Sequence, residues 1–145
     1  MSIKVTKTGR RPGAVFLDDK AAQALALYAK TLISQRTFTR GVGADDRPLP
    51  AYTTAYAAKR AKAARRVSPP DYTITGRTRR SIRSVSRRAG SRTRITIGVV
   101  GQRAIVAKAL SSRGEWMALS PSDKPKFERA LRSFIAATRK RQGVA

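Results

Sequence analysis

The stretch from Tyr72 to Gly114 contains no acidic residue, yet it is dense in arginine. A surface with this much positive charge repels copies of itself unless a polyanion neutralises it or acidic partners face it. We therefore expect the fold to be organised around this stretch and a partner of opposite charge. Its basic residues are Arg77, Arg79, Arg80, Arg83, Arg87, Arg88, Arg92, Arg94, Arg103, Lys108 and Arg113.

Two short strands are predicted inside this stretch, joined at Ala89-Gly90-Ser91. Clear alternation of apolar and polar residues is present in the second strand, up to Val99. Before the strands, Thr75-Gly76 predicts a turn, and Thr78 to Ile82 predicts a single turn of helix. The interleaved arginines would form a basic stripe on one side of the hairpin. The predicted apolar side consists of Ile82, Val85, Ile95, Ile97 and Val99.

Three segments before the hairpin carry secondary-structure signals. Ser2 to Thr6 alternates like a short strand. Asp18 to about Gln35 predicts a helix, because alanines and leucines recur at helical spacing after an acidic start. Tyr52 to Arg66 predicts a second helix, small-sided and strongly basic. The proline pair within Val67 to Tyr72 predicts an extended connector after it.

The carboxyl-terminal part of the chain predicts one more helix. Ser120 is a good amino-terminal cap, Pro121 suits the first helical position, and Asp123 closes a pair that resembles a capping box. Trp116, just upstream, is predicted to pack on this helix. The apolar run from Ile105 to Leu110 is compatible with a strand or a helix, because its periodicity does not decide between them.

The length and apolar content favour a single domain with its own core. A chain of 145 residues, 41% of them hydrophobic, can bury about two-thirds of the surface that its unfolded form exposes. We expect one domain over residues 1–145, with a basic arm at about 1–15, a flexible loop at about 39–51 and a frayed basic tail at about 139–145. The expected fold class is α+β: a small antiparallel β-sheet or hairpin packed against two to three α-helices.

The charge balance restricts the partners. The formal net charge is +24, from 32 basic and 8 acidic residues, which favours nucleic acid over a membrane surface or an acidic protein. The chain has no cysteine and no histidine, so it lacks thiolate metal ligands and the commonest general base. It also lacks a signal-peptide core and any run of roughly 18 apolar residues, so we expect no membrane association.

Few residues are candidates for catalysis or metal binding. Asp45 and Asp46 are adjacent carboxylates, but two such groups without a third oxygen ligand form a poor magnesium site. We interpret them as solvated loop charges. No glycine-rich phosphate loop followed by Lys-Ser or Lys-Thr is present. We therefore expect no enzymatic activity, no cofactor and no metal ion.

Basic residues of the predicted hairpin and second helix are the candidate nucleic-acid contacts. The arginine fork binds phosphate oxygens through two parallel hydrogen bonds and is weakly hydrated. The chain lacks zinc-ligand spacing, an aromatic RNA-recognition strand and a suitably placed GXXG loop, which favours phosphate contact over base readout. The candidate contacts are Arg77, Arg79, Arg80, Arg83, Arg87, Arg88, Arg92 and Arg94, with Lys59, Arg60, Lys62, Arg65 and Arg66.

Several short motifs follow one another in a family-like order. They are Arg47-Pro48-Leu49-Pro50 with Tyr52, Tyr56 and Lys59; Ile74-Thr75-Gly76-Arg77 with Arg80, Ser81 and Ile82; and Trp116, Leu119, Ser120 and Asp123. In their order and spacing, between roughly Arg40 and Thr138, the chain resembles the virion morphogenesis or tail completion proteins of tailed phages. These are small neck proteins found where the tail tube meets the head.

The resemblance implies an α+β subunit of a homo-oligomeric ring, most often a hexamer, in the neck of the virion. Such a ring would complete the tail, join it to the head and surround the DNA channel, facing double-stranded DNA without sequence specificity. The implied partners are tail-tube or tail-terminator proteins and head-connector proteins. The implied location is the virion, after synthesis in the host cytoplasm. Candidate assembly contacts are Arg47, Pro48, Leu49, Pro50, Tyr52, Tyr56 and Trp116.

Other interpretations of the charge stay open. A stand-alone, sequence-independent nucleic-acid binder of the nucleoid- or ribosome-associated type would use the same basic surface as a monomer or dimer. The charge would alternatively face acidic partner subunits instead of nucleic acid. A basic amphipathic helix can also lie on a membrane, but the apolar side of the last helix is narrow and the domain needs it for a core.

Overall fold

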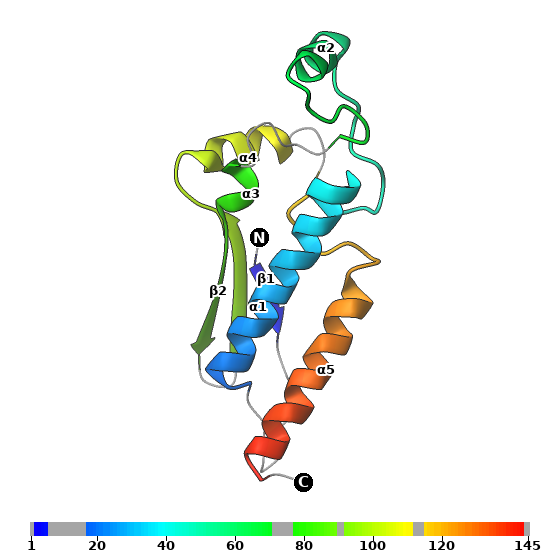
Figure 1. Ribbon diagram of the computed structural model, residues 1–145. Coiled ribbons are helices and arrows are strands. Elements are labelled where there is room, and N and C mark those ends of the chain that lie inside the picture. The colour runs from blue at the N-terminus through cyan, green and yellow to red at the C-terminus, as the bar shows by residue number, and fades with distance from the viewer. Residues whose placement is uncertain (1, 6–16, 71–76, 90–91, 112–114, 144–145) are drawn as a thin grey trace.

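The computed structural model describes residues 2–5, 17–70, 77–89, 92–111 and 115–143 (Figure 1). Helices and a small antiparallel sheet form an α+β arrangement, which confirms the predicted fold class. Along the chain the elements are β1 (Ser2–Val5), α1 (Asp19–Ser34), the π-helical segment η1 (Gln35–Arg40), α2 (Thr54–Lys62), α3 (Arg77–Arg80), β2 (Ile82–Ala89), β3 (Arg92–Val99), α4 (Arg103–Ser111) and α5 (Lys124–Arg141).

The sheet has three antiparallel strands in the order β1-β3-β2. The predicted hairpin is confirmed, with Ile82 opposite Val99 at its open end and Ala89 opposite Arg92 next to the turn. The predicted amino-terminal strand is confirmed as well, and it pairs with the far edge of β3. The hairpin strand that shows clear alternation in the sequence is therefore the central strand of the sheet.

Helix α1 lies across one face of the sheet and packs against β2 and β3 (Figure 1). Asp18 caps its start, because the Asp18 carboxylate accepts a hydrogen bond of 2.6 Å from the backbone N–H of Ala21. Leu25, Ala29 and Ile33 are completely buried on the face that the alanine and leucine spacing predicts. The prediction of this helix is confirmed, and its small side chains allow close approach to the strands.

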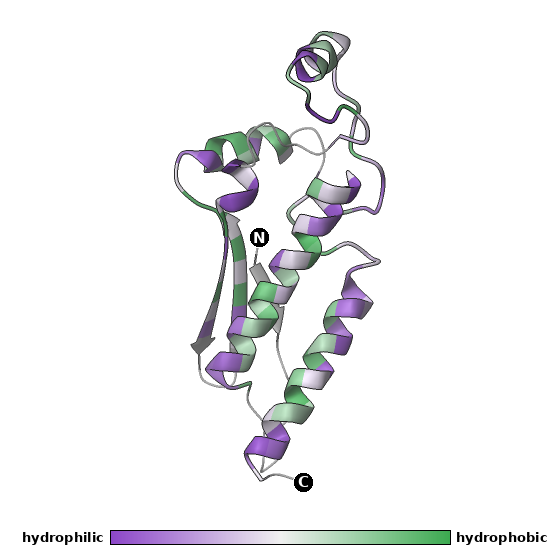
Figure 2. Cartoon of the chain, in the orientation of Figure 1, coloured by the Kyte–Doolittle hydropathy of each residue, from purple (hydrophilic) through white to green (hydrophobic). Residues whose placement is uncertain are grey.

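Helix α5 runs alongside α1 (Figure 1). Phe127 is buried in the core, and Phe134 packs against it from the edge. Asp18 and Arg141 form an ion pair of 2.7 Å between the start of α1 and the end of α5. Figure 2 shows hydrophobic residues along α1 and strongly hydrophilic residues at the carboxyl end of α5. The two helices thus close the core on the side away from the outer sheet face.

The start of α5 differs from its prediction. The helix begins at Lys124, and Pro125, rather than Pro121, lies in its first turn. Ser120 instead organises the tight turn before the helix: its hydroxyl accepts from the N–H of Asp123 at 3.2 Å, and its carbonyl accepts from the N–H of Lys124 at 3.0 Å. The Asp123 carboxylate makes no capping bond, because it pairs with a buried arginine described below.

The structure differs from the prediction for one residue of the hairpin, and it decides the secondary structure of the run that begins at Ile105. The even-numbered residues of β2 share the inner face with Ile95 and Ile97, so Val85 lies on the outer face and is 49% exposed. Its assignment to the apolar side is wrong. Side chains alternate between the two faces of a strand, so Val85, three residues after the buried Ile82, faces the opposite side. The undecided run that begins at Ile105 is helical and belongs to α4.

The segment after α1 extends beyond the sheet. Gly41 ends η1 with a φ of 68°, and a Cβ on it would lie 2.4 Å from the carbonyl oxygen of Pro70, so only glycine fits there. The chain between these residues forms a loop and α2, which projects past the end of α1 (Figure 1). Helix α2 is confirmed but shorter than predicted, ending at Lys62. The predicted Thr75-Gly76 turn lies outside the described residues.

Candidate nucleic-acid interface

The outer face of the sheet carries arginine side chains. Ile82, Ile95 and Ile97 are buried in the core. Because side chains alternate along a strand, Arg83, Arg87 and Arg94 face the opposite side of the sheet, where they are exposed. This is the predicted basic stripe, which the structure places on the face that α1 leaves uncovered. Hereafter the outer arginine face means Arg83, Arg87 and Arg94.

Like charges stand opposite one another on this face. Arg87 of β2 is the direct cross-strand neighbour of Arg94 on β3. Like charges directly opposite destabilise a sheet. This pair therefore favours a ligand of opposite charge, since such a ligand would remove the repulsion.

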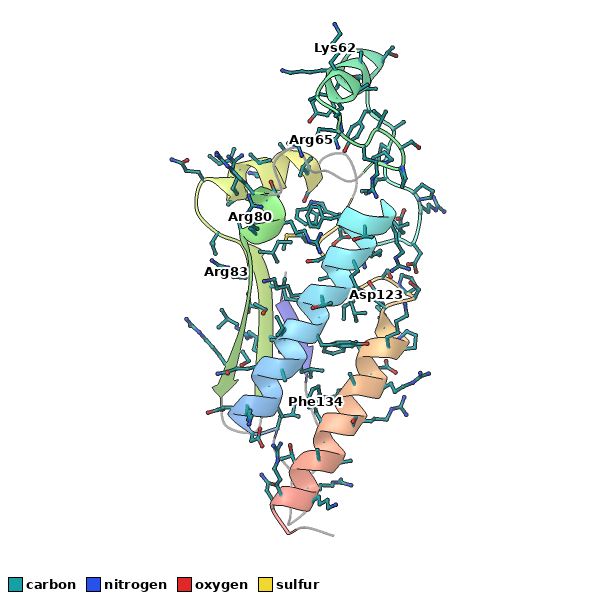
Figure 3. The ribbon with its side chains drawn as sticks, viewed as in Figure 1. Lys62, Arg65, Arg80, Arg83, Asp123 and Phe134 are labelled. Atoms are coloured by element: carbon teal, nitrogen blue, oxygen red, sulfur yellow. The ribbon has the colours of Figure 1, made fainter. Side chains whose placement is uncertain are left out.

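A second group of arginines gathers at the open end of the hairpin. Arg77 and Arg80 on α3 are exposed, while Thr78 between them is buried and anchors this short helix. Arg103, at the start of α4, is half-buried beside them. Together with Arg83 they line an open hollow of about 520 Å³. Figure 3 shows Arg80 on α3 and Arg83 at the adjoining end of the hairpin. The remaining lining residues are Ser81, Val100, Gly101 and Gln102.

Backbone hydrogen bonds hold the walls of this hollow together. The N–H of Val100 donates to the carbonyl of Ser81 at 3.1 Å, which ties the chain after β3 to the chain before β2. The hydroxyl of Ser81 donates to the carbonyl of Arg77 at 2.8 Å. Gly101 then adopts a φ of 68°, a conformation that favours glycine, and the chain turns into α4. These bonds position the arginines of three different elements around one space.

Four acidic residues of the described chain form ion pairs away from the sheet. The ion pairs join Asp18 to Arg141, Asp123 to Arg36, Asp45 to Arg47 and Glu128 to Arg132. None of these carboxylates belongs to the sheet, α3 or α4. Within residues 17–70, 77–89, 92–111 and 115–143, the arginines that make no ion pair include Arg79, Arg83, Arg87, Arg94 and Arg103.

The basic residues around α2 form a separate group. Lys59, Lys62 and Arg65 are exposed, and Figure 3 shows Lys62 on the projecting helix, away from the sheet. Burial removes Arg60 from the candidate phosphate contacts: its guanidinium lies 4.8 Å from the ring centroid of Tyr52. The fold thus does not bring the predicted contacts of α2 onto the outer arginine face.

Three other predicted contacts are placed as follows. The guanidinium of Arg66 donates to the carbonyls of Thr39 at 2.8 Å and Phe38 at 3.2 Å, so it holds the chain after α2 against the end of η1. Arg88 and Arg92 are in register with Thr93 and Ala89 respectively. The side chains of Arg88 and Arg92 lie outside the described part of the structure.

The predicted assembly contacts divide into buried and exposed residues. Trp116 is completely buried, with its ring centroid 5.5 Å from that of Phe38, and Leu49 is also buried. Both are therefore core residues and offer no surface to a partner. Tyr52 and Tyr56 are half-buried and contact each other edge to face at 5.2 Å. The exposed candidates are Arg47, Pro48 and Pro50.

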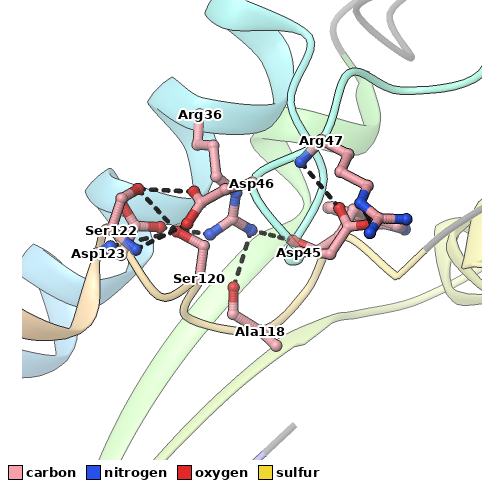
Figure 4. Close-up of polar contacts among 9 residues, drawn as sticks. Arg36, Asp45, Asp46, Arg47, Ala118, Ser120, Ser122 and Asp123 are labelled. Carbon is pink, nitrogen blue, oxygen red and sulfur yellow. Dashed lines mark hydrogen bonds and ion pairs between the residues drawn. The ribbon is translucent and has the colours of Figure 1, made fainter.

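A buried ion pair between Arg36 and Asp123 was not predicted. Both side chains are 0% exposed, and Arg36 also donates to the carbonyls of Trp116 at 2.7 Å and Ala118 at 2.8 Å (Figure 4). Burial lowers the pKa of Arg36, while the charge of Asp123 opposes that shift. Arg36 lies in the mostly polar segment Gln35–Arg40, so the local sequence gives no signal for a buried ion pair and does not name the partner.

Asp46 is more than a solvated loop charge, which corrects the interpretation from sequence. Its carboxylate accepts hydrogen bonds from the N–H of Ser122 at 2.8 Å and from the hydroxyl of Ser122 at 2.6 Å (Figure 4). These hydrogen bonds lower the pKa of Asp46. Asp45 instead accepts from the N–H of Arg47 within the same loop, at 3.0 Å. Asp46 thus fastens the loop to the turn before α5.

We expect Asp46→Asn to lower stability at neutral pH, with a difference that disappears in acid. Asparagine tolerates the φ of 62° at this position but carries no charge. The lowered pKa of Asp46 means that its stabilisation is present above the unfolded value of about 3.9 and is lost as pH falls through the folded pKa. Thermal unfolding of both proteins between pH 7 and pH 2 measures this, with Asp45→Asn as the control. A difference that stays constant across this range would contradict the assignment.

Metal binding and membrane insertion find no support in the described chain. No three His, Cys, Asp or Glu residues of that part group together as a metal site would require. Among the same residues, none of the helices has the length and hydropathy needed to cross a membrane.

Comparisons with protein-family models, with curated proteins and with solved structures give no match for this chain. The resemblance to tail completion proteins thus depends on the order of short motifs alone.

Proposed function

We propose that this chain binds double-stranded DNA without sequence preference, as a structural subunit in the neck of a tailed-phage particle. The observation that carries the DNA-binding part is the shared exposure of Arg83, Arg87 and Arg94 on the outer face of the sheet, next to the arginines of α3 and α4. Attraction to phosphates and release of their counterions supplies most of the affinity in binding of this kind.

The side chains on this surface favour phosphate contact over base readout. Arginine forks bind phosphate oxygens in pairs, and phosphate contacts carry no sequence information. The stacked pair Tyr52 and Tyr56 belongs to the α2 region and not to the sheet. Unpaired bases are usually held by aromatic stacking. The described outward-facing residues of β2 and β3 include no aromatic side chain, which favours a duplex backbone as the ligand.

The neck location is supported by the motif order and by an exposed apolar area beside the arginines. On α4, Ile105 is 77% exposed and Val106 is 37% exposed, and Val100 lies just before them. Exposed apolar side chains that gather in this way are typical of protein contacts. A ring of copies, with a hexamer as the expected form, would place them between subunits and direct the arginines toward the DNA channel. Tail-tube or tail-terminator and head-connector proteins would be its neighbours.

The native mass of the purified protein, measured by light scattering at low and high salt with and without a short duplex, tests this proposal. We expect a closed multi-subunit ring that persists in high salt, because apolar contacts are not screened. We also expect duplex binding that weakens steeply with salt and is equal for unrelated sequences. A monomer that gains mass only with DNA would instead favour a stand-alone nucleic-acid binder. Absence of any salt-dependent duplex binding would overturn the DNA-binding part.

A further inference from the structure

We infer that the groove between α1 and α5 is a docking site for an acidic amphipathic helix of a partner protein. The groove has a volume of about 660 Å³ and is formed by one face of each helix. It is separate from the outer arginine face, so the inference goes beyond the proposed DNA binding and does not depend on it. The lining that carries the argument consists of Leu27, Tyr28 and Thr31 of α1 and Lys126, Arg129 and Phe134 of α5.

Helical spacing explains why these residues share one groove. The lining runs from Ala24 to Thr31 on α1 and from Lys126 to Phe134 on α5, and residues three and four apart share a helix face. The two helices run alongside each other (Figure 1). Between Ala24 and Thr31, α1 advances about 10 Å, or about two helical turns. A groove of this length accepts the side chains of one face of a third helix.

The floor of the groove is apolar and open. Leu27 is 57% exposed, while Tyr28 and Phe134 are half-buried and pack against the core. The small side chain of Ala130 leaves the space between them unfilled. The hydroxyl of Thr31 donates to the carbonyl of Leu27 at 3.0 Å, so it already has a partner within its own helix. Exposed apolar side chains that gather in this way are typical of protein contacts.

Positive charge lies along one edge of the groove. Lys126 and Arg129 are exposed on α5, and the lining residues include no carboxylate. Lys126 is the third residue of α5, where the positive end of the helix dipole disfavours a cation. An acidic side chain of a ligand would offset that repulsion. Because the α1 edge is uncharged, the charge complementarity predicts acidic residues along one edge of the partner helix, the edge next to α5.

Other occupants fit the groove less well. A second copy of the chain is disfavoured because each copy carries a formal net charge of +24. A helix that lies on a membrane immerses a continuous apolar face, whereas the apolar residues here line a concavity between two helices. Nucleic acid would leave the apolar floor without a matching surface. An acidic helix with an apolar stripe matches both the floor and the edge.

A pair of variants tests the apolar floor. Leu27→Gln removes the exposed leucine from the groove and keeps a residue of good helix propensity. Val85→Gln is its control, because Val85 is 49% exposed on the outer face of the sheet. Both positions are exposed, and circular dichroism with thermal unfolding establishes that the variants are folded.

A second pair tests the basic edge. Lys126→Gln/Arg129→Gln removes two charges from the groove. Arg83→Gln/Arg94→Gln removes the same charge from the outer arginine face. A difference between these two variants therefore reports the position of the charge and not its amount.

The probe is a labelled synthetic helix of about 18 residues, or five turns, followed by fluorescence anisotropy. It has leucines at i, i+3, i+4 and i+7 and glutamates along one edge of that stripe. We expect saturable binding at one site per chain, weakened about fivefold or more in each groove variant and less than about twofold in each control. A permuted peptide without the stripe, and a peptide with lysine in place of glutamate, should both bind at least about tenfold more weakly.

Several results would overturn the inference. Absence of saturable peptide binding is one, and equal binding of the permuted peptide is another, because it would show diffuse attraction of charge. Without peptide binding, a lower native mass of Leu27→Gln in light scattering would assign the groove to a second copy. Cosedimentation with anionic phospholipid vesicles that Leu27→Gln abolishes would, in the same case, assign it to a lipid surface.

Anisotropy with a DNA duplex on the same proteins keeps this inference distinguishable from the proposed function. We expect Lys126→Gln/Arg129→Gln to lose peptide affinity and to keep most of its duplex affinity. Peptide binding without salt-dependent duplex binding would support the groove and overturn the proposed DNA binding. Duplex binding without peptide binding would overturn this inference and leave the proposed function standing.

Discussion

Asp123→Ala is expected to lower the free energy of unfolding by about 3–5 kcal/mol. The substitution leaves the guanidinium of Arg36 completely buried without its counter-charge, and such a charge has no access to water that could replace the lost carboxylate. Arg36→Met is expected to have a similar cost, since it leaves the Asp123 carboxylate buried and also removes the donor to the carbonyls of Trp116 and Ala118.

The double variant Arg36→Met/Asp123→Leu distinguishes the contribution of the ion pair from that of the hydrogen bonds that Arg36 donates to the neighbouring carbonyls. Replacing both members of a buried ion pair by apolar residues is often neutral or even stabilising. Here two carbonyls would still lose their donor, at about 1–3 kcal/mol for each unsatisfied group. We therefore expect the double variant to be more stable than either single variant and less stable than the unmodified protein.

Urea unfolding followed by Trp116 fluorescence measures these effects, because this tryptophan is the only one in the chain and contacts the site through its carbonyl. Glu128→Ala is the control: it removes the exposed ion pair with Arg132, of 3.7 Å, and should cost at most about 1 kcal/mol. An Asp123→Ala variant that unfolds within the range of this control would contradict the role assigned to the pair.

The second large effect is expected for DNA binding. The triple variant Arg83→Glu/Arg87→Glu/Arg94→Glu reverses the outer arginine face, and we expect its affinity for a duplex at about 0.1 M salt to fall by roughly a hundredfold or more. Each lost phosphate contact should also reduce the slope of log affinity against log salt by about 0.9, so the combined reduction is on the order of 3. Anisotropy titrations over a range of salt concentrations measure both quantities.

A matched reversal on α5 provides the control for this experiment. Lys126, Arg129 and Arg139 are exposed on that helix and lie away from the outer face of the sheet. Changing these three to Glu alters the net charge by the same amount. We expect a loss of affinity at least about tenfold smaller than that of the sheet variant. Equal losses would mean that the total charge, and not the arginine face, determines binding.

Local patterns in the sequence were sufficient for much of the architecture. Helix α1, the short strand β1, the hairpin, the single turn α3 and the α+β class could all be predicted, because each leaves a periodic or capping signal within a few residues. The arginine stripe could be predicted for the same reason, since strand alternation decides which residues share a face.

Only the tertiary structure decided which faces and ends come together. Arg36 and Asp123 are 87 residues apart, and nothing in the local sequence of either one names the other. Arg103 joins the arginines of α3 because Gly101 and the bond from Val100 to Ser81 direct α4 toward them. Periodicity describes one element at a time, whereas a buried pair or a shared hollow arises from packing between elements, and packing depends on shape and desolvation across the whole chain.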